Sequence, residues 1–214
     1  MTQTIAPIIP PQTNFPFVLH NISWETYEQL LQLFAEKSAL RMTYYHGILE
    51  LMVPLPDHER YSWTLGRLVT VLSEELGLEI LGLKSTTWRS KPKAVGKEAD
   101  ECFYIQNEAK VRGKLKIEIG VDPPPDLAIE IDTTHSSIDK IAIYADLQVP
   151  EVWRWQNNQI VIHILADGQY TESETSLAFG TFPVKELSNF VQLDSTKGEN
   201  ARMREFRHWV RSNL

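Results

Sequence analysis

The apolar positions of the chain follow two spacings, and each spacing predicts a different kind of element. Three segments repeat apolar residues every three or four positions, which buries one face of a helix. Ser23 is typical of an N-cap before the first of these segments, and Gly77 is typical of a stop after the second. The helices predicted from this pattern span residues 24–36, 58–76 and 199–212.

Shorter segments with alternating, β-branched or aromatic residues predict strands. Two of them meet at His46-Gly47 and another two at Asn157-Asn158, dipeptides that favour tight hairpin turns. The predicted strands span residues 40–45, 48–53, 79–88, 97–105, 126–132, 151–156, 159–165 and 170–176. The sequence also predicts a helix at 136–147, a helical turn at 184–189, and a linker at 106–120 with a short strand near 115–119.

Length and composition indicate a single domain. The 214 residues are 43% hydrophobic and 23% charged, as in an ordinary globular protein that buries its own core. Residues 1–21 are rich in proline and predict an extended N-terminal arm, and residues 22–214 then form the domain. The first residues lack the pattern of a signal peptide, and no apolar run approaches the roughly 18 residues of a membrane helix. We expect a cytoplasmic protein without membrane contact.

The formal net charge of -7 limits the possible functions, and the single cysteine bears on the cellular compartment. A protein that coats nucleic acid non-specifically neutralises many phosphates with basic side chains, and an acidic chain does not fit that class. The negative charge is compatible with a nuclease, because carboxylates that bind a metal ion contribute to an acidic net charge. Cys102 has no second cysteine to pair with, which is consistent with a reducing compartment.

The segment 126–132 carries the strongest candidate site. Side chains alternate across a strand, so the three aliphatic residues share one face and the three acids share the other with Ala128. Three carboxylates on one face are costly to bury unless something positive lies beside them. Glu130 and Asp132 lie about 7 Å apart along the strand, close enough to flank one ion, whereas Asp126 lies roughly 13 Å from Glu130.

Two further residues are within reach of Glu130. The predicted helix after the strand runs back over it at about 1.5 Å per residue, which brings the long side chain of Lys140 to the level of Glu130. Asp100 lies on the predicted strand 97–105. If that strand pairs with the strand 126–132, Asp100 becomes a cross-strand neighbour of Glu130.

An aspartate, a glutamate and a lysine on adjacent elements are the groups that metal-assisted phosphodiester hydrolysis requires. Carboxylate oxygens suit Mg²⁺ or Mn²⁺. Such an ion polarises a phosphoryl oxygen and lowers the pKa of a bound water. The lysine can orient that water, help to deprotonate it, or stabilise the charge that develops on the phosphate.

Five motifs, taken together and in this order, resemble the Uma2 family of endonucleases, which is assigned to the PD-(D/E)XK nuclease superfamily. The resemblance runs from about Trp24 to Leu165, most of the chain. The motifs are the 47–56 hairpin leading to His58, residues 98–105 (EADECFYI), residues 125–131 (PDLAIEI), residues 137–140 (SIDK) with Tyr144-Ala145, and residues 149–153 (VPEVW).

The resemblance implies a restriction-endonuclease-like α/β fold, with a central mixed sheet and helices on both of its faces. It implies that Asp100 and Glu130 are metal ligands. Many superfamily members carry a lysine two residues after the second acid, but Asp132 occupies that position here, and Lys140 on the helix resembles its replacement. Ala99 stands where the family usually has proline, a change that leaves the ligand in place.

Several neighbouring residues have a structural interpretation as well as a functional one. Asp132 is either a third metal ligand or a cap for the following helix, and Lys140 is either catalytic or a solvated helix residue. His58 and Glu59 are candidates for an accessory role near the metal, although an acid at a helix start also suits the helix dipole. Asp126 is better explained as a structural residue that holds the proline-rich entry to its strand.

Aromatic and basic residues elsewhere also have two interpretations. Trp153 and Trp155 can stack on bases, but buried aromatic residues are commoner in a sheet. Four residues form either a basic rim for a phosphate backbone or a solvated face: Lys84, Arg89, Lys91 and Lys93.

The sequence therefore predicts a Mg²⁺- or Mn²⁺-dependent endonuclease that acts on DNA, with Asp100, Glu130 and Lys140 at its centre. The pattern does not separate DNA from a structured RNA. The alternative is a catalytically silent nucleic-acid-binding or regulatory module on the same fold, which the acidic net charge and the lack of a strong basic tract favour. A homodimer fits duplex cleavage, because two strands need two sites or two passes.

Overall fold

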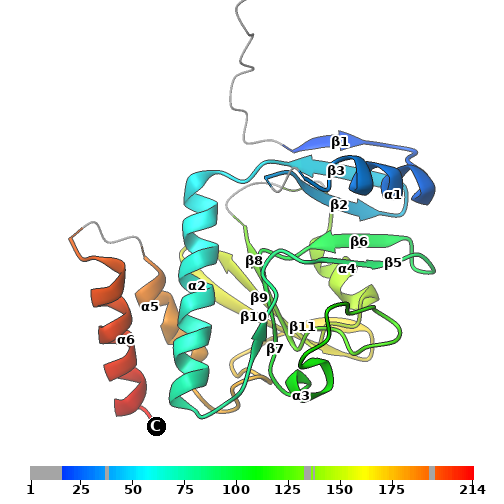
Figure 1. The fold of residues 1–214 in the computed structure, drawn as a ribbon. Coiled ribbons are helices and arrows are strands. Elements are labelled where there is room, and N and C mark those ends of the chain that lie inside the picture. Colours follow the sequence, from blue (N-terminus) through cyan, green and yellow to red (C-terminus); the bar gives the residue numbers. More distant parts are fainter. Residues whose placement is uncertain (1–15, 37–38, 133–135, 137, 193–195) are drawn as a thin grey trace, which may run out of the picture.

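Two β-sheets meet near the middle of the molecule, and helices lie against both of them (Figure 1). The structure is a computed structural model that describes residues 16–36, 39–132, 136, 138–192 and 196–214. The predicted α/β class is confirmed, and one of the two sheets is the expected mixed sheet. The second sheet was not predicted as a separate unit.

The first sheet, sheet A, is antiparallel and has the strand order β1-β3-β2-β6-β5. The β2–β3 hairpin turns at His46 and Gly47, which both have positive φ, as the predicted tight turn requires. Helix α1 (Trp24–Leu33) packs on this sheet, and the hydroxyl of Ser23 caps it by accepting a hydrogen bond from the amide of Thr26. The strands span Phe17–Leu19 (β1), Arg41–Tyr45 (β2), Ile48–Met52 (β3), Thr87–Ser90 (β5) and Val95–Glu98 (β6).

The second sheet, sheet B, has the strand order β11-β10-β9-β8-β7-β4. It is mixed, because β8 and β9 run parallel while its other neighbouring strands run antiparallel. The β9–β10 hairpin turns at Asn157 and Asn158, both with positive φ, as predicted. The strands span Leu81–Gly82 (β4), Glu101–Tyr104 (β7), Leu127–Ile131 (β8), Glu151–Gln156 (β9), Gln159–Ala166 (β10) and Gln169–Ser173 (β11).

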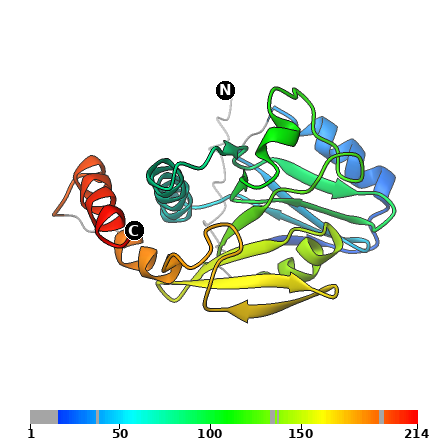
Figure 2. The ribbon, with the colours of Figure 1, turned by 90° about the horizontal axis from the view of Figure 1, so that it is seen from below.

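Helices α2 and α6 lie side by side on one face of sheet B, and α4 lies on the other (Figures 1 and 2). α2 starts at Pro56, whose missing N–H is harmless in a first turn, and the positive φ of Gly77 follows its end. The helices span Pro56–Glu75 (α2), Glu108–Val111 (α3), Lys140–Asp146 (α4), Ser188–Val191 (α5) and Glu199–Ser212 (α6), with a 3₁₀ turn at Val184–Leu187 (η1).

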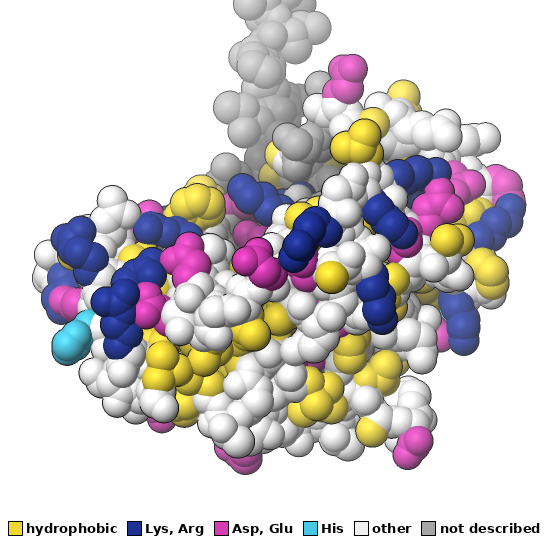
Figure 3. Space-filling model, turned by 60° about the horizontal axis from the view of Figure 1, so that its bottom comes forward, with side chains coloured by type: hydrophobic (Ala, Val, Ile, Leu, Met, Phe, Trp, Pro, Cys, Tyr) yellow, Lys and Arg dark blue, Asp and Glu magenta, His cyan; other side chains and the backbone are white. Residues whose placement is uncertain are grey.

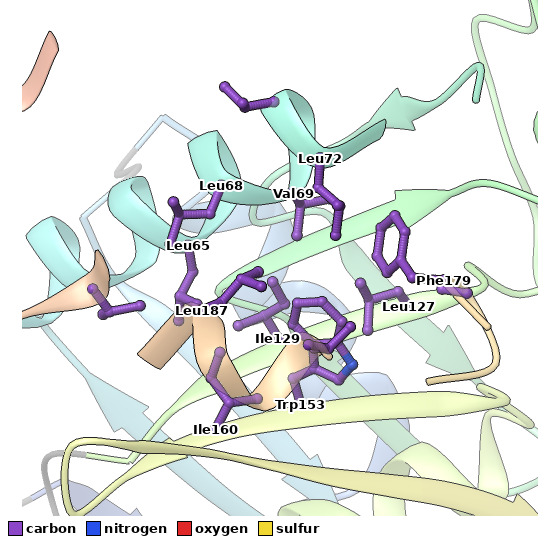
Figure 4. Packing of buried hydrophobic residues seen from close by; sticks show 14 of the residues in the cluster. Leu65, Leu68, Val69, Leu72, Leu127, Ile129, Trp153, Ile160, Phe179 and Leu187 are labelled. Atoms are coloured by element: carbon purple, nitrogen blue, oxygen red, sulfur yellow. The ribbon is translucent and has the colours of Figure 1, made fainter. Parts of the chain in front are cut away.

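The largest hydrophobic cluster fills the space between sheet B and the helices α2, α5 and α6 (Figure 4). Leu127, Ile129 and Ile131 of β8 point into this cluster, where they meet the buried stripe of α2 around Leu65. A second cluster lies between the opposite face of sheet B, α4, and the strands β5 and β6. Glu130 points to that second side, so β8 has the aliphatic face and the acidic face that its alternation predicted.

Two predicted strands are each interrupted where the chain crosses from one sheet to the other. Predicted strand 79–88 forms β4 of sheet B and then β5 of sheet A, with Lys84 in a left-handed conformation between them. Predicted strand 97–105 forms β6 of sheet A and then β7 of sheet B, with the break at Ala99 and Asp100. The prediction of continuous strands was wrong, because local alternation of side chains does not report a change of sheet.

The predicted helices 24–36, 58–76 and 199–212 are confirmed, the last with the same bounds. The predicted helix 136–147 begins later, at Lys140. The carboxylate of Asp139 accepts hydrogen bonds from the first free amides of α4 and so fixes its start.

The predicted linker 106–120 contains α3, and in place of the strand at 115–119 it has one β-bridge, between Ile119 and Asp122. Most of the predicted arm 1–21 lies outside the described residues. Its last part contains β1, which pairs with β3, so the division into an arm and a domain stays a prediction. None of the helices that the structure describes combines the length and the apolar character needed to cross a membrane.

Gly96 in β6 faces the buried ring of Tyr27 from α1. A Cβ at this position would lie 2.7 Å from Cζ of Tyr27, closer than carbon atoms approach in a folded protein. We expect Gly96→Ala to lower the free energy of unfolding by about 1–3 kcal/mol, because the ring must leave its packed position. Chemical denaturation measures the loss. The matched control is Gly198→Ala, which adds the same methyl group in open space; an equal loss in both variants would contradict the packing argument.

Glu101 of β7 is buried under α2, where its carboxylate lies against Gly66. Burial raises the pKa of Glu101 from 4.5 to about 7. As the pH rises from 4.5 to about 7, the unfolded chain releases this proton before the folded chain does, so the folded state loses stability over that range.

We therefore expect Glu101→Gln to be more stable than the parent above that range, by on the order of 1–3 kcal/mol. Below the range the two proteins differ little in this respect, because the carboxyl group is protonated in both states. Thermal unfolding on the two sides of the range tests this, and a difference in stability that does not change with pH would contradict it.

Candidate active site

The predicted carboxylates lie where β6 passes into β7, beside the end of β8. β7 and β8 are antiparallel neighbours with Glu101 opposite Ile129, so Asp100 comes next to Glu130. The amide of Asp100 donates a hydrogen bond to the carbonyl of Ile129 at 3.2 Å. The predicted cross-strand relation of Asp100 and Glu130 is confirmed, although the strand that carries Asp100 is interrupted there.

Groups from two other elements hold Asp100. Its Oδ2 accepts a hydrogen bond from the amide of Ile131 at 2.8 Å, and Nε2 of His58 lies 3.3 Å from the same oxygen. The hydroxyl of Ser62 donates to the carbonyl oxygen of Asp100 at 3.1 Å. Burial alone would raise the pKa of Asp100, but His58 and two nearby ammonium groups hold it well below its usual range. Asp100 is therefore a carboxylate at neutral pH.

The two accessory candidates at the start of α2 point in different directions, His58 toward the protein interior and Glu59 toward the surface. His58 is almost fully buried, and although burial opposes its charge, its contact with Asp100 raises the pKa of His58. The side chain of Glu59 is 53% exposed, and its carboxylate lies 3.5 Å from the guanidinium of Arg41. Of the two accessory candidates, the structure brings His58 to the site and leaves Glu59 at the surface.

Glu130 has 1% of its surface exposed, and basic and hydroxyl groups surround its carboxylate. The hydroxyl of Tyr144, from α4, donates a hydrogen bond to Oε1. Nζ of Lys97, from β6, lies 3.0 Å from the same oxygen, and Nζ of Lys140 lies 3.1 Å from Oε2. A buried carboxylate requires such partners, because removing a lone charge from water costs several kcal/mol.

Lys140 is the first residue of α4 and reaches back to β8, as the chain path predicted. The reach comes from its side chain at the helix start, whereas the prediction placed about one turn of helix before Lys140. Nζ donates a hydrogen bond to Oδ1 of Asp132 at 3.2 Å, in addition to its contact with Glu130. Although burial opposes its charge, these two carboxylates raise the pKa of Lys140 above its ordinary value. Lys140 is therefore a permanent cation.

Asp132 lies at the outer end of β8 between two cations. Its Oδ1 pairs with Lys140, and its Oδ2 accepts a hydrogen bond from Nε of Arg154 at 2.6 Å. The alternative role of Asp132 as a helix cap is not supported, because Asp139 caps α4. A cavity of about 270 Å³ opens beside these groups, lined by Asp132, Ser136, Ile138, Asp139, Lys140, Ile141 and Arg154.

Three residues of this site were missed in the sequence: Lys97, Tyr144 and Arg154. In a continuous strand 97–105, alternation puts Lys97 on the face opposite to Asp100. The break at Ala99 changes the direction of the chain and brings Lys97 to Glu130. Tyr144 was part of a motif without an assigned role. Arg154 was weighed only as a neighbour of two tryptophans, and the parallel pairing with β8 places it beside Glu130.

The other candidates have structural roles. Asp126 accepts hydrogen bonds from the amides of Ile105 and Asn107 at 2.7 and 2.8 Å, as expected for a residue that holds the strand entry. Trp153 and Trp155 are buried in the core of sheet B. Cys102 is buried, and its thiol donates a hydrogen bond to the carbonyl of residue 84.

The predicted basic rim is not assembled as one surface. Arg89 lies 4.0 Å from Glu28, Lys91 lies 3.1 Å from Glu25, and Lys93 lies 3.7 Å from Asp146. Lys84 lies apart from them, over the ring of Trp63. On the face shown in Figure 3, basic and acidic side chains are likewise interspersed.

Comparison with known proteins assigns a family. A family model described as "Putative restriction endonuclease", Uma2, matches residues 24–194. The chain belongs to the Uma2 family. Among solved structures, it is similar to "a putative nuclease belonging to DUF820" from Anabaena variabilis, with 12% identity and a TM-score of 0.41 over 79% of this chain and 90% of that chain. A comparison with curated proteins finds no match.

The donor set of this Uma2 site fits a hard divalent ion. Mg²⁺ commonly takes one or two protein carboxylates and completes its shell with water and phosphate oxygens. Asp100 and Glu130 supply two carboxylates from neighbouring strands. Within the described ranges, no three His, Cys, Asp or Glu side chains converge to hold an ion, so the predicted set of Asp100, Glu130 and Asp132 is not a three-ligand cluster.

Replacing Glu130 tests how far the site holds the fold together. We expect Glu130→Ala to lower the free energy of unfolding by about 3–5 kcal/mol, because it leaves two buried ammonium groups without their shared carboxylate. Adding Lys97→Met removes one of these charges and should recover part of the loss. Chemical denaturation of the two single variants and the double variant measures this coupling.

The control is Glu59→Ala, which removes an exposed ion pair and should change the stability by less than about 1 kcal/mol. If the losses of the two single variants simply add in the double variant, Lys97 and Glu130 are not coupled and this account of the site is wrong.

Proposed function

We propose that this Uma2 protein is a Mg²⁺- or Mn²⁺-dependent endonuclease that hydrolyses phosphodiester bonds in DNA. Membership of the family indicates a nuclease in general terms. The observation that supports the finer proposal is the pair of buried carboxylates, Asp100 just before β7 and Glu130 opposite it on β8, with lysines on both oxygens of Glu130.

Asp100 and Glu130 would hold the ion through their carboxylate oxygens. A divalent ion there polarises a phosphoryl oxygen and lowers the pKa of a bound water. Tyr144 and Lys97 fix the orientation of Glu130, and His58 does the same for Asp100. The fixed orientation keeps the oxygens in place, so little reorganisation is needed when substrate binds.

Lys140 acts as an electrostatic group rather than as a base. Its ammonium lies against two carboxylates, which raise its pKa and favour the charged form. Beside the 270 Å³ cavity it can hold a phosphoryl oxygen and stabilise the charge that develops there. Arg154 lines the same cavity with a guanidinium suited to phosphate, and Asp132 orients both cations.

The charges of the site also indicate when the ion binds. Three acidic side chains (Asp100, Glu130, Asp132) face three basic ones (Lys97, Lys140, Arg154), with His58 beside Asp100, so acidic and basic groups nearly balance before an ion arrives. A divalent ion then brings an excess of positive charge, which phosphates of a bound nucleic acid neutralise. We infer that ion and nucleic acid bind more tightly together than either binds alone.

A homodimer and a cytoplasmic location remain part of the proposal.

The test is cleavage of supercoiled plasmid by the purified protein with Mn²⁺ or Mg²⁺. We expect nicking or linearisation that stops with a chelator and falls by at least about 100-fold in Asp100→Asn and in Glu130→Gln. Lys140→Met should lower the rate by about 100-fold as well, since it removes charge stabilisation. The matched control, Glu205→Gln on the exposed side of α6, should keep full activity. Cleavage that persists in Glu130→Gln would remove the assignment.

A second candidate function is a nucleic-acid-binding or regulatory module on the same fold that does not turn over. The observation that favours it is the pairing of Glu130 and Asp132 with basic side chains, together with the absence of a cluster of three ligands among the residues described. Calorimetry with Mn²⁺ in the millimolar range, with and without duplex DNA, separates the two. An absence of ion binding in both experiments supports the silent module.

A further inference from the structure

A second cavity, with a volume of about 430 Å³, lies between α2, the end of β4, β7 and α6. Its walls include Trp63 and Gly66 of α2, Gly82 of β4, and Glu101 and Phe103 of β7. None of the paired groups around Glu130 lines it. It is therefore separate from the candidate active site, although Glu101 directly follows Asp100 in the chain.

Glu101 is a buried acid that points into this cavity without a partner. It has 7% of its surface exposed, and among the described residues its carboxylate has neither a hydrogen bond nor an ion pair. Its oxygens are not among the fully enclosed atoms that lack a partner, so they face the cavity, where little water can reach them. A ligand that donates hydrogen bonds to Glu101 would replace that limited hydration.

Two glycines keep the space around Glu101 open. A Cβ on Gly66 would lie 3.1 Å from Oε1 of Glu101, and a Cβ on Gly82 would lie 3.1 Å from Cε1 of Phe103. Neither glycine has a positive φ, so backbone conformation does not require glycine at these positions. The absence of a side chain at these two positions keeps the space between α2 and sheet B open.

An aromatic ring and basic groups lie at the mouth of the cavity. Trp63 is 46% exposed, which is unusual for so large an apolar side chain. Nζ of Lys84 lies 5.5 Å and Cζ of Arg67 lies 5.9 Å from the centre of its ring. Arg207 of α6 lines the cavity as well. Arg67 and Arg207 are paired with Glu199 and Glu74, so the mouth combines a flat ring with the charge of Lys84, and the floor carries a hydrogen-bond acceptor.

We propose that this cavity binds a nucleobase, guanine in preference, with Glu101 accepting hydrogen bonds from the donor edge of the base. The proposal rests on the proposed nuclease function, which supplies a nucleic acid as the source of the base. Trp63 offers a face for stacking, and Lys84 offers a charge for the attached phosphate.

The chemistry of the floor distinguishes among ligands. Guanine presents a ring N–H and an amino group side by side, which match the two oxygens of one carboxylate. Uracil and thymine present a single ring N–H between two carbonyl oxygens, and these oxygens repel a carboxylate. The basic side chains around the cavity do not all carry free charge: Arg67 and Arg207 are paired with Glu199 and Glu74, which leaves Lys84 beside the ring of Trp63.

The experiment is calorimetry of the whole chain with GMP and with UMP, in the presence of a chelator so that no cleavage takes place. We expect saturable GMP binding that is at least about tenfold tighter than UMP binding. Glu101→Gln should remove most of this preference, since an amide cannot accept both donors. Trp63→Ala should weaken both nucleotides by about tenfold or more, the usual effect of losing a base stack.

The matched control is Glu199→Gln. Glu199 accepts a hydrogen bond from Nε1 of Trp63 at 3.3 Å and pairs with Arg67, so this variant removes the ion pair between α2 and α6 while Glu101 and the ring remain. GMP affinity should stay within about twofold of the parent. A loss as large as that of Trp63→Ala would mean that Trp63 acts only through the helix contact.

Three results would overturn the proposal: no saturable GMP binding by the parent in the millimolar range, equal binding of GMP and UMP, or an unchanged preference in Glu101→Gln. The experiments also distinguish a failure of the base-binding proposal from a failure of the nuclease proposal. Asp100→Asn should abolish plasmid cleavage and keep GMP binding. If the parent binds GMP but never cleaves nucleic acid, the nuclease proposal fails and the base-binding cavity stands.

Discussion

The buried carboxylate of Glu130 ties together parts of the molecule that belong to different layers. Glu130 itself lies on β8 of sheet B, Lys97 comes from β6 of sheet A, and Lys140 and Tyr144 come from α4. A charge at this depth is stable only while all of these partners stay in place. The same contacts therefore fix the two sheets and the helix relative to one another and give the candidate site its geometry.

The crossing of the chain between the sheets at Ala99 and Asp100 has a second effect. It turns consecutive acids toward different surroundings: Asp100 toward His58 and the end of β8, and Glu101 toward Gly66 and the cavity under α2. One carboxylate has a pKa far below its usual range and the other has a raised pKa. The environment thus gives two neighbouring carboxyl groups opposite electrostatic character, one suited to an ion and the other to hydrogen-bond donors.

The balance of charge relates the site to the acidic chain that contains it. The net charge of -7 argues against binding to nucleic acid by bulk attraction, and on the face shown in Figure 3 the basic residues are interspersed with acids. Under the two proposals, recognition comes from local groups: Lys140 and Arg154 at one cavity, and Lys84 and Trp63 at the other. This arrangement favours a protein that engages a few nucleotides closely over one that follows a long stretch of backbone.

The sequence by itself determined the elements whose cause is local. The helical spacing of apolar residues gave α1, α2 and α6, Asn157-Asn158 gave a hairpin, and alternation along 127–131 put Glu130 on the acidic face of its strand. The order of the five motifs predicted the Uma2 family, and the match to the family model confirms it. Only the tertiary structure decided which sheet each half of 97–105 joins. That choice also brings Lys97 into contact with Glu130. Periodicity reports which face of an element is buried, whereas a contact between residues far apart in the chain depends on how separate elements pack.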